Sequence, residues 1–88
     1  MIGLITVNFN QYKLTTDFLD SLASVDDAKN ISVFIADVST NKEVLNIDKK
    51  YPMNVIVKSF PNFGYAYGIN KGIKYFIEKG FDKWRYRG

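Results

Sequence analysis

Two residue types on which much enzyme chemistry depends are missing, because the chain contains no cysteine and no histidine. Disulfide frameworks, thiol nucleophiles, zinc fingers and all sites that use imidazole as acid, base or metal ligand are therefore excluded. Only two residues are proline and six are glycine, which excludes collagen-like and low-complexity proteins. Any chemistry must come from carboxylates, amides, hydroxyls, lysine or arginine.

Long apolar runs are also missing. The apolar run at the N-terminus is too short to span a bilayer, and no basic segment precedes it as in a signal peptide. The absence of cysteine is typical of a reducing compartment, so a cytoplasmic protein without a transmembrane segment is expected. With 88 residues, of which 47% are hydrophobic and 24% charged, the chain is predicted to form one domain over residues 1–88.

Positive charge is concentrated in the last third of the chain. The net charge is −2 for residues 1–57 and +5 for residues 58–88. A basic segment favours anionic partners such as nucleotides, nucleic acid or a lipid surface, and the charge alone does not choose among them.

The pattern of apolar residues predicts alternating strands and helices. Uncharged runs rich in β-branched residues predict strands, whereas apolar residues at steps of three or four predict helices. The predicted strands are residues 2–9, 31–36 and 54–58, the predicted helices are residues 12–25 and 67–79, and residues 38–52 are predicted to be a loop with at most a turn or two of helix around residues 42–47. The tail, residues 81–88, alternates aromatic and basic side chains and could start a fourth strand.

The spacing also predicts which helix faces are apolar. These positions are Leu14, Phe18, Leu22 and Val25 in the first helix, and Ile69, Ile73, Phe76 and Ile77 in the second. Gly80 is well placed to end the second helix.

This order of elements predicts an α/β fold with three layers and a mainly parallel sheet. In open sheets of this kind ligands bind at the carboxyl ends of the strands, near the point where the strand order reverses. The segments expected there, residues 8–10, 37–40 and 59–64, are all polar. A ligand site at this edge is therefore expected.

Three segments resemble glycosyltransferase family 2, which has the GT-A fold. Residues 5–10 (ITVNFN) are similar to the family's first strand, and residues 33–41 (VFIADVSTN) are similar to its strand ending in Asp-Asn-Ser or Asp-Asp-Gly-Ser. Residues 62–73 (NFGYAYGINKGI) resemble the family's Asn-x-Gly segment that leads into the next helix. The three segments occur in the family's order, and the fold that they imply is the Rossmann-like half of a GT-A domain.

The resemblance implies a site for a nucleotide-diphosphate sugar, such as a UDP-, GDP- or dTDP-sugar. Asp37 would accept a hydrogen bond from the base or the ribose, and Asn70 would lie in a helix whose N-terminus favours phosphate. The implied binding residues are Val7, Asn8, Asn10, Asp37, Ser39, Asn62, Gly64, Asn70 and Lys71. From the residues alone, Asp37, Asn62 and Asn70 could equally be turn and cap residues.

The chain also departs from the family. Val38 stands where the family usually has Asn or Asp, and Ile69 stands where many members have Arg or Asn. The resemblance covers only the N-terminal part of the family, and no Asp-x-Asp segment occurs to hold Mg²⁺ or Mn²⁺. The chain is therefore interpreted as truncated, with an atypical tail at residues 83–88, no catalytic residue and no metal ligand.

In the complete enzyme, Mg²⁺ or Mn²⁺ and transfer of the sugar to a saccharide or lipid-linked acceptor are expected, in the cytoplasm or at the membrane periphery. Two alternatives stay open. The chain could be a non-catalytic basic α/β module for nucleic acid, although nucleic acid is the less favoured partner. It could also be a remnant that forms homo-oligomers through an exposed sheet edge.

Overall fold

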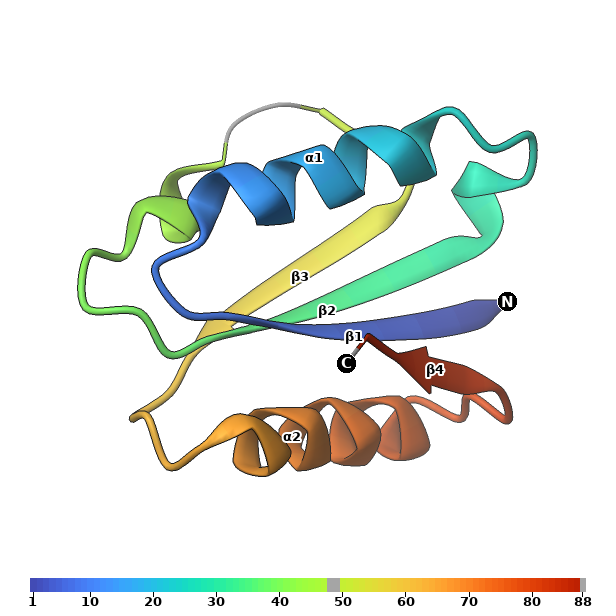
Figure 1. Cartoon of the computed structure of the whole chain (residues 1–88). Coiled ribbons are helices and arrows are strands. Elements are labelled where there is room, and N and C mark those ends of the chain that lie inside the picture. The colour runs from blue at the N-terminus through green and yellow to red at the C-terminus, as the bar shows by residue number, and fades with distance from the viewer. Residues whose placement is uncertain (48–49, 88) are drawn as a thin grey trace.

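The computed structural model describes residues 1–47 and 50–87 and shows an α/β fold with one four-stranded sheet, in which all strand pairs are parallel. Helices α1 and α2 lie on opposite faces of this sheet, so the chain forms three layers (Figure 1). The elements are β1 (Ile2–Asn8), α1 (Tyr12–Ala23), η1 (Ala28–Asn30), β2 (Ile31–Asp37), η2 (Glu43–Asn46), β3 (Asn54–Ser59), α2 (Tyr65–Glu78) and β4 (Trp84–Tyr86). The predicted fold class is confirmed.

The strand order is β3-β2-β1-β4, with β1 and β2 in the centre. The chain moves from β1 to β2 and β3 in one direction across the sheet, and α2 then returns it to the other side of β1, where β4 pairs. The order therefore reverses between β1 and β4. Both helices begin at the edge where the carboxyl ends of the strands meet (Figure 1).

Alternating side chains of the central strands build a core on each face of the sheet. On the α1 face, Leu19 packs with Val33 and Ile35. On the α2 face, Ile5 and Phe34 pack with Phe76. Because both faces of β2 are covered, all seven of its residues are buried, which explains its uncharged apolar sequence apart from the terminal Asp37.

Helix α2 lies close to β1 because glycines face the sheet. A Cβ atom at Gly72 would lie 2.5 Å from Cγ2 of Ile5, and one at Gly68 would lie 2.8 Å from Cγ2 of Val7. These glycines therefore permit close packing of the helix on the sheet. The first turn of α2 is thereby held beside the end of β1.

Gly80 ends α2 as predicted. It has a φ of +82°, and its N–H donates to the carbonyl of Ile77 at 3.0 Å while the N–H of Phe81 donates to the carbonyl of Phe76 at 2.9 Å. This pair of bonds is a Schellman motif, and the ring contact between Phe76 and Phe81 supplies its usual apolar contact.

The predicted helix faces need correction. Leu14 and Val25 are 52% and 48% exposed, and Val25 lies beyond the end of α1. The buried residues of α1 are Thr15 and Leu19, while the predicted Phe18 and Leu22 are partly buried and pack against the core. In α2, which begins two residues earlier than predicted, Ile69 and Phe76 are buried as predicted, together with Gly68 and Gly72. Ile77, by contrast, is 56% exposed.

The remaining element predictions hold with small shifts. Strand β1 ends at Asn8 rather than at residue 9, β2 includes Asp37, and β3 extends to Ser59. The loop over residues 38–52 contains only η2, and its residues 48–49 lie outside the described residues. In the tail, Trp84–Tyr86 forms β4, whereas residue 88 lies outside the described part.

Candidate functional site

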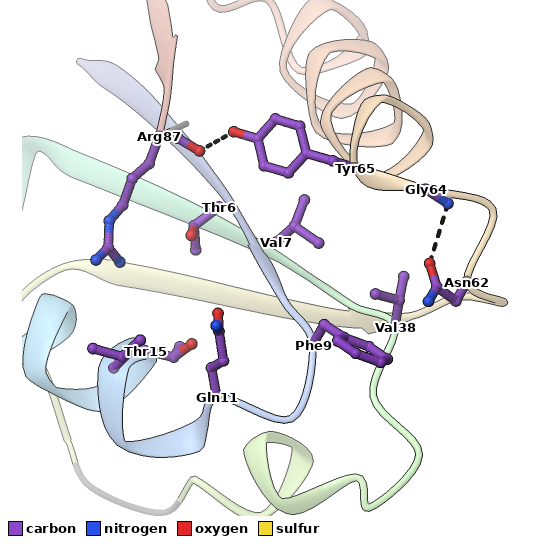
Figure 2. Close-up of a pocket in the computed structure, with 11 residues that line it drawn as sticks. Thr6, Val7, Phe9, Gln11, Thr15, Val38, Asn62, Gly64, Tyr65 and Arg87 are labelled. Carbon is purple, nitrogen blue, oxygen red and sulfur yellow. Dashed lines mark hydrogen bonds between the residues drawn. The ribbon is translucent and has the colours of Figure 1, made fainter.

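A cavity lies at the carboxyl edge of the sheet, where the strand order reverses between β1 and β4. It has a volume of about 440 Å³, and it is surrounded by segments that lie far apart in the sequence (Figure 2). Its lining residues are Thr6, Val7, Phe9, Gln11, Leu14, Thr15, Val38, Asn62, Gly64, Tyr65 and Arg87. This is the position at which open parallel sheets bind their ligands.

Both helix N-termini border this cavity. Gln11, Leu14 and Thr15 belong to the start of α1, and Gly64 and Tyr65 belong to the start of α2. Neither helix has a capping hydrogen bond from its N-cap side chain, and neither has Asp or Glu in its first turn. Because the first backbone N–H groups of a helix have no intrahelical partner, these two ends favour an anion.

Arg87 carries the only charge that lines the cavity in the described part of the chain. Its backbone N–H donates to the carbonyl of Ile5 at 2.9 Å, which extends the pairing of β4 with β1. The Tyr65 hydroxyl donates to the Arg87 carbonyl (Figure 2). The residue after β4 is therefore tied to both β1 and α2.

The Tyr65 hydroxyl is held in its neutral form. Burial raises the pKa of the Tyr65 phenol above its usual range, the neighbouring Tyr86 raises it further, and Arg87 opposes them. A neutral phenol can donate to the Arg87 carbonyl, whereas a phenolate could not.

A buried polar network lies beside the cavity, on the α1 face. The Asn8 amide donates to Asp37 Oδ1 at 3.1 Å and to Ser39 Oγ at 2.9 Å. Thr15 donates its hydroxyl to Asn8 Oδ1 at 2.7 Å, and the Ser39 N–H donates to Asp37 Oδ1 at 3.1 Å. Within the described residues, Asp37 Oδ2 is buried without a hydrogen-bond partner.

This network joins three predicted binding residues, Asn8, Asp37 and Ser39, in one cluster. None of the three is among the residues that line the cavity. All three are buried, with Asp37 fully so. Contact of Asp37 with a base, which the resemblance implies, stays a prediction. In the structure its observed role is to hold the two loops that follow β1 and β2.

Asn10 joins the same two loops at the surface. Its backbone N–H donates to Ser39 Oγ at 2.8 Å, and its Oδ1 accepts from the Thr40 N–H at 3.1 Å. It has a φ of +52°, a left-handed conformation that Asn tolerates better than most residues. Asn10 thus shapes the loop that carries Phe9 and Gln11 into the cavity.

Three of the predicted residues line the cavity itself. Val7 lies near the end of β1, while Asn62 and Gly64 belong to the loop before α2. Asn62 Oδ1 accepts from the Gly64 N–H at 3.1 Å (Figure 2). Gly64 has a φ of +97°, which favours glycine at this N-cap.

The structure places the last two predicted residues elsewhere. Asn70 is exposed on α2 and is not among the lining residues. Lys71 borders a second, smaller cavity of about 170 Å³, formed with Phe34, Lys58, Phe60, Lys74, Tyr75 and Glu78. The Lys71 ammonium lies 5.1 Å from the ring centre of Tyr67.

The residues described here do not fit a divalent metal ion. Among the side chains lining the main cavity in the described residues there is no carboxylate, although Mg²⁺ and Mn²⁺ prefer carboxylate and other oxygen ligands. Across residues 1–47 and 50–87, no three His, Cys, Asp or Glu side chains lie close enough together to hold a metal.

The chain was also compared with other proteins. Neither the models of known protein families, nor the curated proteins, nor the solved structures contain a match to it. Within the described residues, no helix is long and apolar enough to cross a membrane.

Most residues of the cavity wall are not among the predicted binding residues. The additional lining residues are Thr6, Phe9, Gln11, Leu14, Thr15, Val38, Tyr65 and Arg87. Phe9 and Gln11 flank the predicted Asn10 in the polar loop after the first strand. Their position next to Asn10 could therefore have indicated that they line the site. Arg87 belongs to the basic tail that favours anionic partners, but its place in this cavity depends on the pairing of β4 with β1.

Proposed function

We propose that the cavity at the carboxyl ends of β1 and β4 binds a nucleotide-diphosphate sugar. The observation that carries this proposal is that one cavity is bordered by both helix N-termini, while its one charged lining residue in the described chain is the cation Arg87. Helix N-termini and a guanidinium both stabilise phosphate. The phosphates would lie toward Arg87 and Tyr65.

The apolar side of the cavity suits a base. Phe9 is 47% exposed at its edge, and Val38 lies near it in the wall (Figure 2). An exposed aromatic ring offers a stacking surface for a base. Asn62 offers an amide for polar contact with the ribose or base.

The resemblance to glycosyltransferase family 2 supports a sugar on the diphosphate. In the complete enzyme, the sugar would be transferred to a saccharide or lipid-linked acceptor with Mg²⁺ or Mn²⁺, in the cytoplasm or at the membrane periphery. This chain would supply donor binding. Because no catalytic residue was identified in it, we expect no sugar transfer by the 88-residue chain alone.

Calorimetric titration of matched aromatic variants tests the proposal. UDP-, GDP- and dTDP-sugars are titrated into the wild-type chain, Phe9→Ala and Phe63→Ala. Phe63 is 69% exposed and is not a lining residue, so it is the control. Loss of one stacked base is worth about 1–3 kcal/mol, so Phe9→Ala should weaken binding by about tenfold and Phe63→Ala should not. Equal affinities in all three proteins would contradict the base position.

A second candidate is binding of single-stranded nucleic acid at the smaller cavity beside α2. Lys58, Lys71 and Lys74 surround Phe60 and Tyr75 at the smaller cavity, and such combinations of lysine and aromatic rings bind phosphates and bases. Steep weakening of oligonucleotide binding with salt, reduced by Lys71→Gln and unaffected by Phe9→Ala, would favour this candidate.

Self-association is a third candidate and is compatible with the first. In the described sheet, β3 and β4 each have only one neighbouring strand, and Leu14 and Val25 are exposed on the α1 side. Open strand edges can pair with another copy. Sedimentation velocity at several concentrations would show a rising mass if copies associate, and a constant monomer mass would exclude it.

A further inference from the structure

The backbone of Arg87 makes two hydrogen bonds that do not involve its side chain. Its N–H bonds to Ile5 and its carbonyl accepts from Tyr65. Substituting the side chain therefore leaves both of these bonds available. The guanidinium can be removed without removing the contacts that position β4.

Arg87 lines the cavity, and its guanidinium stacks on a ring of α1. Its central carbon lies 4.5 Å from the ring centre of Phe18 in α1, and the side chain extends from the end of β4 toward α1 (Figure 2). Stacking on a ring uses the flat face of the guanidinium, whereas its N–H donors lie in the plane. Within residues 1–47 and 50–87 no carboxylate pairs with it.

The charge around the cavity is therefore suited to binding an anion without a metal ion. A bridging metal needs carboxylates to hold it, and none is among the described lining residues. A guanidinium can bind two phosphate oxygens through parallel N–H bonds and needs no bridging ion.

We propose that Arg87 binds the phosphate of the ligand directly, so that nucleotide binding by this chain is independent of divalent cations. This inference rests on the proposed function. In this proposal Arg87 binds the phosphate of the nucleotide sugar without a metal ion. The metal ion would be needed only for sugar transfer in the complete enzyme.

The experiment compares two arginines of the same strand region. UDP and uridine are titrated into the wild-type chain, Arg87→Gln and Arg85→Gln, each with EDTA and with Mg²⁺. Arg85 is the control, because it is exposed, donates to the Trp84 carbonyl at 3.0 Å and does not line the cavity. We expect Arg87→Gln to weaken UDP binding by about tenfold or more and to leave uridine binding unchanged, since only the phosphate contact is lost.

The outcomes separate the two proposals. UDP binding that requires Mg²⁺, or that is equal in wild-type and Arg87→Gln, overturns the role of Arg87 while the nucleotide site stands. Failure of the wild-type chain to bind any of the nucleotides overturns both. If circular dichroism shows that Arg87→Gln does not fold, the wild-type chain alone still tests the inference. In EDTA, UDP must then bind to it more tightly than uridine. Equal affinities for UDP and uridine would contradict the inference.

Discussion

Asn8 donates to Asp37 across the ends of the two central strands, with 3.1 Å between Asn8 Nδ2 and Asp37 Oδ1. The parallel register places these two residues opposite each other, so the contact follows directly from the pairing of β1 with β2. Ser39 and Thr15 complete the network. Asn8, Asp37 and Ser39, which were expected to contact a ligand, thus hold in place the loops beside the cavity.

Removal of the Asp37 carboxylate should therefore destabilise the fold. Asp37→Ala leaves the Asn8 amide and the Ser39 N–H without this acceptor in a buried region, at a cost of about 1–3 kcal/mol. Asp17→Ala is the control, because Asp17 is exposed and its pair with Lys13 is worth at most about 0.5 kcal/mol. Urea unfolding followed by circular dichroism measures both. Equal stability of Asp37→Ala and the wild-type chain would show that the network contributes nothing.

Close packing of α2 predicts a large effect of adding one methyl group. In Gly72→Ala the new Cβ would lie 2.5 Å from Ile5 Cγ2, and such overpacking costs about 1–3 kcal/mol. The gain in helix propensity of about 1 kcal/mol opposes it. Asn70→Ala, at an exposed position of the same helix, should be neutral or slightly stabilising. Thermal unfolding of both variants measures these changes in stability. A Gly72→Ala variant more stable than the wild-type chain would contradict the close contact between α2 and β1.

The raised pKa of Tyr65, caused by burial and by the neighbouring Tyr86, predicts a loss of stability in alkali. Since the pKa of Tyr65 is raised in the folded chain, its contribution is fully present below the unfolded pKa of about 10 and is lost as the pH rises through the folded pKa. The melting temperature of the wild-type chain should therefore fall toward that of Tyr65→Phe above about pH 10. A difference between the two proteins that is the same at pH 8 and pH 11 would contradict this.

Elements set by local pattern were predicted well from the sequence. The uncharged runs around Ile35 and Val55 gave β2 and β3, and Gly80 gave the end of α2. These features depend on neighbouring residues and on the allowed backbone angles of glycine.

Features that depend on long-range packing were not predicted. Leu14 has the spacing of a core residue, yet the packing of Thr15 against Asn8 turns Leu14 toward the cavity. Arg87 joins the site only because β4 pairs beside β1, and periodicity within the tail does not specify the neighbouring strand. The cavity therefore lies at the carboxyl ends of the strands, where the sequence predicts a ligand site, and Val7, Asn62 and Gly64 are the predicted residues that line it.

The most direct measurement is an NMR titration of the isotopically labelled chain with UDP. The proposed site predicts amide shifts at Val7, Phe9, Asn62, Gly64 and Arg87, the ring of segments around the main cavity. Amides beside the smaller cavity, such as that of Lys74, should stay unchanged. A folded spectrum without shifts, or shifts confined to the smaller cavity, would contradict nucleotide binding in the main cavity at the carboxyl ends of β1 and β4.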